Sequence, residues 1–155
     1  MACGGNLSDE QRKKLRDGME QQKIVRVTES EILAASLDKG QEVMTAIGKR
    51  KFSPLLADSL EKAYGVKVRF AVPGAANAHA IEQELVEAYI TGIVTGAADE
   101  NLQKVYTDSD KTAFDSVLYS KPAVNIVPDG SEILEGVWNI YMPKKQIVLE
   151  ISKTK

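Results

Sequence analysis

The first third of the chain repeats apolar residues at the spacing of a helix face. Capping-box patterns begin at Ser8 and at Thr28, each followed three residues later by Gln or Glu. The apolar residues after the second box are Ile32, Leu33, Leu37, Met44 and Ile47. Two alternatives stay open: one long helix over residues 9–47, or two helices in tandem that break in the β-branched segment 24–28. Gly48 is expected to end the helix.

A helix, a strand and another helix are expected next. Ser53 and Pro54 predict a helix start, with serine as the cap and proline at the first helical position, and Gly65 predicts its end. Residues 66–72 alternate apolar and polar, which predicts a half-buried strand. Asn77 is expected to cap the following helix. The apolar face predicted for that helix is Ile81, Leu85, Val86, Tyr89 and Ile93.

The second half of the chain favours strands. We expect them over residues 102–107, 113–127 and 133–142, with a hairpin turn at 128–130. Lys121-Pro122 interrupts the middle strand and indicates an edge or a bulge, because proline cannot donate to a sheet. The tail 144–153 fits a strand or a helix equally well. Helices first and antiparallel strands later predict an α+β fold. An antiparallel sheet flanked by helices, with a long N-terminal helix, is typical of PAS-like sensor domains.

Composition narrows the possible partners. A chain of 155 residues fits a single domain, and its formal charge of −2 gives no general attraction to nucleic acid or to anionic membranes. Aromatic residues make up only 6%, which argues against a surface that stacks on bases. No apolar run approaches the roughly 18 residues that span a bilayer. We therefore expect no nucleic-acid partner and no membrane contact by the domain itself.

Cys3 is the only cysteine, so neither a disulfide nor a multi-cysteine metal site can form. Residues 1–5 (MACGG) resemble the start of a mature bacterial lipoprotein, in which a small residue precedes the lipidated cysteine. The apolar signal segment is missing, as expected if the chain starts at the cleavage site with an added Met. We expect residues 1–7 to be a tether and residues 8–155 one domain. Lipidated Cys3 would hold that domain on the bacterial cell envelope, on the periplasmic or outer-membrane side. The alternative is a cytosolic protein whose third residue is cysteine.

Three segments together resemble a family of bacterial PAS-like sensory domains that carry c-type haem. The first is residues 64–69 (YGVKVR), followed by a loop and a helix that contains Glu82. Residues 118–124 (LYSKPAV) resemble the strand before the family's haem site, and residues 136–145 (GVWNIYMPKK) the strand after it. The resemblance covers most of the chain from Leu33 onward. It implies a PAS-like fold and a sensory role.

The family's haem attachment motif is missing from this chain. That Cys-x-x-Cys-His motif belongs between the two strands, where residues 125–131 contain neither Cys nor His. Covalent haem needs two thioethers and an axial histidine. The resemblance therefore implies the scaffold without its covalent cofactor, and we expect no cofactor. Non-covalent haem with His79 as its axial ligand remains an alternative.

Candidate chemistry is sparse. His79 is the only histidine, and Glu82 follows three residues later, so the two could share a helix face and hold a metal; a solvated histidine near a helix start is the simpler explanation. A serine triad would need His79 as its base, and no nucleophile-elbow motif accompanies it. Asp108, Asp110 and Asp115 lack the glycine and closing glutamate of a calcium loop and indicate a polar turn. We predict neither a catalytic nor a metal site.

The sequence therefore predicts a non-catalytic sensory or ligand-binding domain, not an enzyme. Its ligand would be an unknown small molecule or an envelope protein, in a pocket between the sheet and the helices. The residues expected to line that pocket are Phe70, His79, Tyr119, Trp138 and Tyr141. Ordinary core packing is the simpler explanation of the three aromatic residues Tyr119, Trp138 and Tyr141. A structural or interaction protein is a further alternative, in which the apolar stripe of the N-terminal helix pairs with another chain.

Overall fold

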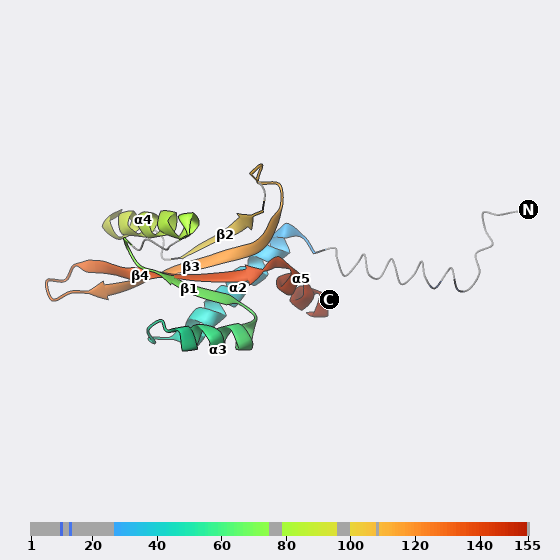
Figure 1. The fold of residues 1–155 in the computed structure, drawn as a ribbon, viewed down its shortest axis with the longest axis horizontal. Coiled ribbons are helices and arrows are strands. Elements are labelled where there is room, and N and C mark those ends of the chain that lie inside the picture. The colour runs from blue at the N-terminus through green and yellow to red at the C-terminus, as the bar shows by residue number, and fades with distance from the viewer. Residues whose placement is uncertain are drawn as a thin grey trace, which may run out of the picture.

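A four-stranded antiparallel sheet with helices on both faces forms the body of the protein (Figure 1). The structure is a computed structural model and describes residues 10, 13, 27–74, 79–95, 100–107 and 109–154. Its elements are α2 (Glu29–Ile47), α3 (Pro54–Tyr64), β1 (Lys67–Ala71), α4 (Ala80–Thr95), β2 (Asn101–Tyr106), β3 (Phe114–Ile126), β4 (Glu132–Pro143) and α5 (Lys144–Thr154). The strand order is β1-β4-β3-β2. The predicted α+β class is confirmed.

Thr28 starts α2 as the capping box predicts. Its backbone is extended (φ −74°, ψ 156°), and its hydroxyl accepts a hydrogen bond of 3.1 Å from the backbone N–H of Glu31. One continuous helix over residues 9–47 is therefore wrong, because the chain is not helical at Thr28. The first helix of the tandem alternative, the cap Ser8 and the tether with Cys3 lie outside the described residues, apart from residues 10 and 13. Gly48 ends α2 with φ of 61°, as predicted.

The buried face of α2 is centred on a glycine that the apolar stripe did not include. Its buried residues are Ile32, Ser36, Gly40, Val43 and Ile47. The Tyr119 ring lies directly on Gly40, where a Cβ atom would stand 2.3 Å from the ring's Cγ. The half-buried side chains of Leu33, Leu37 and Met44 pack against the same core. The stripe that suggested a partner chain therefore covers this domain's own sheet.

Helix α3 begins and ends at the predicted signals. The Ser53 hydroxyl accepts a hydrogen bond of 3.1 Å from the N–H of Leu56 at the start of α3, and Gly65 closes that helix in the left-handed region at φ 68°. The cap expected at Asn77 lies outside the described residues. The ambiguous tail forms a helix, α5, which buries Ile147 against the sheet.

The β3–β4 hairpin extends beyond its neighbours in the sheet (Figure 1). The two strands pair from Ser116↔Pro143 to Ile126↔Glu132, whereas the pairing of β3 with β2 ends at Ser120. Pro122 lies past that point, where its missing N–H removes no ladder bond to β2, and the register shifts just after it, between Ala123 and Val124. Of the two alternatives, an edge or a bulge, the edge is confirmed at Lys121-Pro122, because β3 pairs there with β4 and not with β2.

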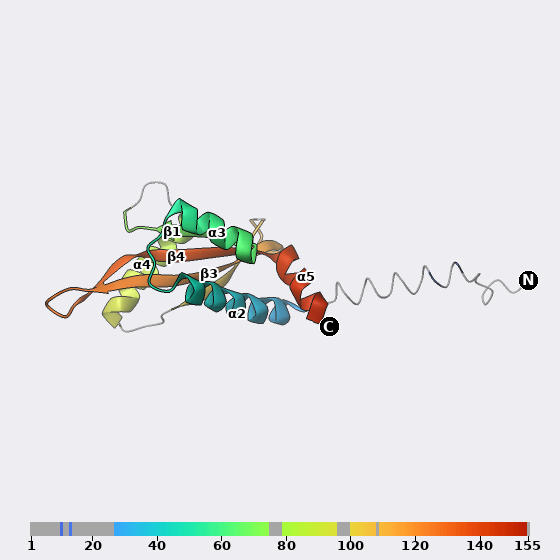
Figure 2. The same cartoon turned by 90° about the horizontal axis from the view of Figure 1, so that it is seen from below.

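The sheet separates two hydrophobic cores. Helices α2, α3 and α5 cover one face, and α4 covers the other (Figures 1 and 2). Because side chains alternate along a strand, β4 contributes to both cores. Its residues Trp138, Ile140 and Met142 belong to the larger core, and Val137 belongs to the smaller core under α4. The helix α4 contributes Leu85, Val86 and Tyr89, as its predicted apolar face requires, while the side chain of Ile93 lies outside the described part.

Candidate functional site

The five residues expected to line one pocket are divided between the two faces of the sheet. Phe70, Tyr119 and Trp138 lie in the larger core under α2, α3 and α5. Tyr141 packs against the smaller core, and His79 directly precedes α4 on that same face. A single pocket through all five does not form. The reason is strand geometry, since Trp138 and Tyr141 are three positions apart on β4 and therefore point to opposite faces.

The three aromatic residues of the larger core have structural partners. The rings of Phe70 and Trp138 meet edge to face with centroids 5.0 Å apart, and Phe52 stacks on Phe70 at 6.1 Å. Tyr119 is fully buried, and its hydroxyl donates a hydrogen bond of 2.6 Å to Glu100. Core packing, the simpler explanation expected for Tyr119 and Trp138, describes both residues, and it describes Phe70 as well.

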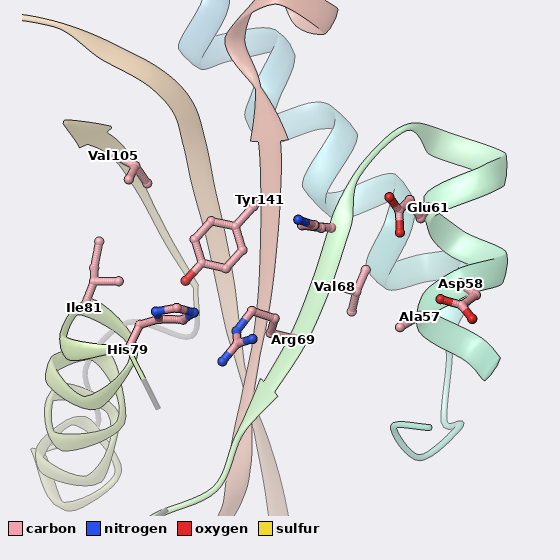
Figure 3. Close-up of a pocket in the computed structure, with 10 residues that line it drawn as sticks. Ala57, Asp58, Glu61, Val68, Arg69, His79, Ile81, Val105 and Tyr141 are labelled. Carbon is pink, nitrogen blue, oxygen red and sulfur yellow. The ribbon is translucent and has the colours of Figure 1, made fainter. Parts of the chain in front are cut away.

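A hollow of about 550 Å³ straddles the edge strand β1, and we call it the edge hollow (Figure 3). On the α4 side it is lined by Arg69, His79, Ile81, Val105 and Tyr141. On the α3 side the lining is Ala57, Asp58, Glu61 and Val68, and Lys67 of β1 completes the set. Two of the five predicted residues, His79 and Tyr141, therefore share this hollow.

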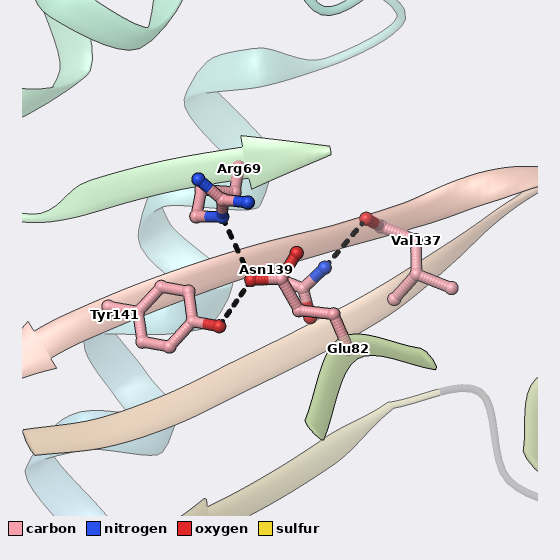
Figure 4. A network of polar contacts seen from close by, with 5 residues as sticks. All are labelled: Arg69, Glu82, Val137, Asn139 and Tyr141. Atoms are coloured by element: carbon pink, nitrogen blue, oxygen red, sulfur yellow. Dashed lines mark hydrogen bonds and ion pairs between the residues drawn. The ribbon is translucent and has the colours of Figure 1, made fainter. Parts of the chain in front are cut away.

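A buried carboxylate forms the polar centre beside the edge hollow. Glu82 in the first turn of α4 is 1% exposed. Its Oε2 accepts a hydrogen bond of 2.9 Å from Nε of Arg69 and another from the hydroxyl of Tyr141 (Figure 4). A carboxylate out of water is stable only when it is paired and hydrogen-bonded, and these two donors, from β1 and β4, meet that need. They also fasten the start of α4 to the sheet.

Tyr141 is held as a neutral phenol. Burial raises its pKa above the ordinary value of tyrosine, and the hydrogen bond to the Glu82 carboxylate and the charge of that group raise it further. The positive charge of Arg69 acts in the opposite direction but is the smallest of the causes. Tyr141 is therefore a hydrogen-bond donor to Glu82 and an apolar ring toward the hollow at neutral pH.

Polar side chains continue from Arg69 across the sheet beneath α4. Asn139 pairs with Arg69 on one side and with Ser120 on the other, so the three share a face. Tyr89 of α4 donates a hydrogen bond of 3.0 Å to the carbonyl of Ser120. Asn139 is fully buried and donates 3.0 Å to the carbonyl of Val137, while its Oδ1 has no protein partner among the described residues (Figure 4). We call Arg69, Asn139 and Ser120 the polar row.

His79 and Glu82 do not act as a pair. The carboxylate of Glu82 is buried and bound to Arg69 and Tyr141, whereas His79 is exposed, with its carbonyl accepting from the N–H of Gln83 at 3.0 Å. Within the described ranges, no three or more His, Cys, Asp or Glu side chains form a group that could hold a metal ion. Of the acidic turn residues, Asp110 and Asp115 are exposed, and Asp108 lies outside the description.

A second hollow, of about 470 Å³, lies between α2 and β3 near the hydroxyl of Tyr119. Glu100 lines it and accepts hydrogen bonds from Tyr119 at 2.6 Å and from Gln41 at 3.1 Å. Both carboxylate oxygens of Glu100 are therefore engaged by side chains of the domain itself. The edge hollow, in contrast, contains the side chain of Arg69, which is 42% exposed. We therefore take the edge hollow as the candidate site.

Comparison with protein-family models finds no match to this chain, and neither the curated proteins nor the solved structures yield one. The resemblance to c-type-haem sensory domains therefore stays a prediction. As for the membrane, none of the helices in the described part is both long and apolar enough to cross one.

Proposed function

We propose that this protein is a non-catalytic ligand-binding domain of the PAS-like sensory type, displayed on the bacterial cell envelope. The observation that carries the proposal is the edge hollow, in which a partly exposed arginine and a neutral tyrosine are fixed by one buried carboxylate. A concave site of a few hundred Å³ with apolar walls and a few placed polar groups is typical of small-molecule binding. The PAS-like part of the proposal is supported by the antiparallel sheet flanked by helices.

Binding is favoured over catalysis by the state of the polar groups at the hollow. Tyr141 keeps its proton at neutral pH, and Glu82 is buried and engaged by two donors. Neither group is available to exchange a proton with a substrate, which general acid–base catalysis requires. His79 is exposed and stands at the rim of the hollow.

A fragment screen observed by ¹H–¹⁵N NMR tests the proposal. Ligands should shift the backbone amides of Ile81, Val105 and Tyr141 together. Val105→Phe, which fills the hollow, should abolish these shifts, whereas Leu149→Phe, at an exposed position of α5 on the opposite face, should not. A broad library in which no compound moves the three amides would overturn the proposal.

The haem alternative is favoured by the position of His79 at this hollow. Haemin titrated into the protein would give a Soret band that saturates at one equivalent and is lost in His79→Ala. A flat titration eliminates haem and leaves organic ligands.

The envelope location rests on Cys3. When the protein is expressed from its own gene in its host, an alkyne-tagged fatty acid should label it, and Cys3→Ser should remove the label. An unlabelled wild-type protein would exclude the anchor while leaving the ligand site untouched.

A further inference from the structure

We infer that the edge hollow binds a small organic acid, with the carboxylate on Arg69 and an apolar body on the wall formed by Ile81, Val105 and the ring of Tyr141. This inference rests on the proposed ligand-binding function and names the chemical class of the ligand.

The free donors of Arg69 are the first reason. A guanidinium carries five N–H bonds in a flat fork, and Arg69 uses its Nε–H on Glu82 at 2.9 Å. Its two Nη groups have no partner among the residues that the structure describes, and the side chain is 42% exposed. The ion pair with Glu82 fixes the direction of the guanidinium before any ligand arrives. The Arg69 guanidinium, held in one direction with two open amino groups, can donate two parallel hydrogen bonds to the two oxygens of a carboxylate.

The distribution of charge is the second reason. Lys67 and Arg69 are two positions apart on β1, so both side chains leave the strand toward α4. The acid on that side is Glu82, which Arg69 and Tyr141 already engage. The other acids of the lining, Asp58 and Glu61, lie beyond β1 on α3 (Figure 3). Lys67 also lines a neighbouring hollow together with Glu61 and Asp115, so its charge has acids nearby. On the α4 side, the two open amino groups of Arg69 are therefore the cationic donors that an anionic ligand would contact.

The apolar wall is the third reason. Ile81 of α4 and Val105 of β2 are half-buried and lie on the same side of the Tyr141 ring in the hollow (Figure 3). Because Tyr141 stays neutral and donates a hydrogen bond to Glu82, it offers its ring rather than a charge. A bare inorganic anion would leave this wall uncovered. An acid with an aromatic or branched aliphatic body covers the wall and reaches Arg69 at once.

The test compares benzoate with benzamide, which has the same ring but no charge. Both are titrated into ¹⁵N-labelled protein, and the amides of Ile81, Val105 and Tyr141 are followed with the side-chain Nε–Hε signal of Arg69. Benzoate should bind at least tenfold more tightly than benzamide, and added salt should narrow that difference. Arg69→Lys should weaken benzoate about tenfold and leave benzamide unchanged, because lysine keeps the charge beside Glu82 but loses the fork.

Arg50→Lys is the matched control, since the Arg50 guanidinium binds the carbonyls of Ala46 and Ile47 at the end of α2 and should leave benzoate binding unchanged. Equal affinities for benzoate and benzamide would overturn the acid class while the ligand-binding function stands. If fragments shift the amides of the hollow but benzoate does not, the acid class also fails. If nothing shifts them, both proposals fail. Should Arg69→Lys not fold, the benzoate–benzamide comparison on the wild-type protein decides alone.

Discussion

The ion pair between Arg69 and Glu82 predicts two very unequal effects on stability when either partner is replaced. The side chain of Glu82 is 2% exposed and that of Arg69 is 42% exposed. Arg69→Met leaves the Glu82 carboxylate buried with the Tyr141 hydroxyl as its one donor among the described residues, and stranding a buried charge costs about 3–5 kcal/mol. Glu82→Gln keeps an acceptor oxygen for both donors and leaves a guanidinium that water can reach, so we expect a loss of about 1–2 kcal/mol.

Urea denaturation at neutral pH measures the two losses. Trp138 is the only tryptophan and is 5% exposed, so its fluorescence reports unfolding of the larger core, and far-UV circular dichroism serves as an independent probe. The urea dependence of the unfolding free energy should be the same for all variants. The double variant Arg69→Met/Glu82→Leu should recover most of the loss, because it removes both charges. A loss from Glu82→Gln equal to or larger than that from Arg69→Met would refute this account of the network.

Three further predictions concern single contacts. Because the pKa of Tyr141 is raised on folding, its contribution to stability is complete at neutral pH and declines progressively as the pH rises above about 10. The advantage of wild type over Tyr141→Phe in urea denaturation should therefore shrink with rising pH in that range. Gly40→Ala should destabilise the fold by about 1–2 kcal/mol in the same assay, because overlap with the buried Tyr119 ring exceeds the gain in helix propensity; an unchanged midpoint would contradict the close contact. Phe52→Ala removes a ring that contacts Phe70 and Trp138, and should cost about 1–2 kcal/mol and shift Trp138 emission to longer wavelength. An unaltered emission spectrum would refute it.

Local signals predicted most of the secondary structure. The caps at Thr28 and Ser53 and the glycines Gly48 and Gly65 act within a few residues of their own position, and the structure confirms all four. The tail 144–153 could not be decided locally, because its apolar residues fit two periods. Packing of Ile147 against the sheet selects the helix.

The site depended on contacts between residues distant in sequence. Alternation along β1 assigned Arg69 to a solvent face, yet α4 covers that face and brings Glu82 onto it. One signal for Glu82 was available, since it lies four and seven positions before Val86 and Tyr89 and so shares the apolar face of its helix. The sequence also shows that Trp138 and Tyr141 are three positions apart on one predicted strand, which places their side chains on opposite faces. No local pattern marks Asn139, whose burial follows from the sheet register and the helix above it.

The two cores give the molecule two levels of local stability. Among the described helices, only α4 covers its face, over a small apolar cluster and the polar row, while α2, α3 and α5 enclose the larger core together. A helix packed in this way can open locally without unfolding of the larger core. The backbone amide hydrogens of α4 should therefore exchange with solvent before those of α2. The edge hollow is lined by the start of α4 and by β1 and β4. A ligand bound there would have to dissociate before α4 could separate from the sheet. Ligand binding in the hollow would then lengthen the time that α4 stays packed on the sheet, without changing the shape of the domain.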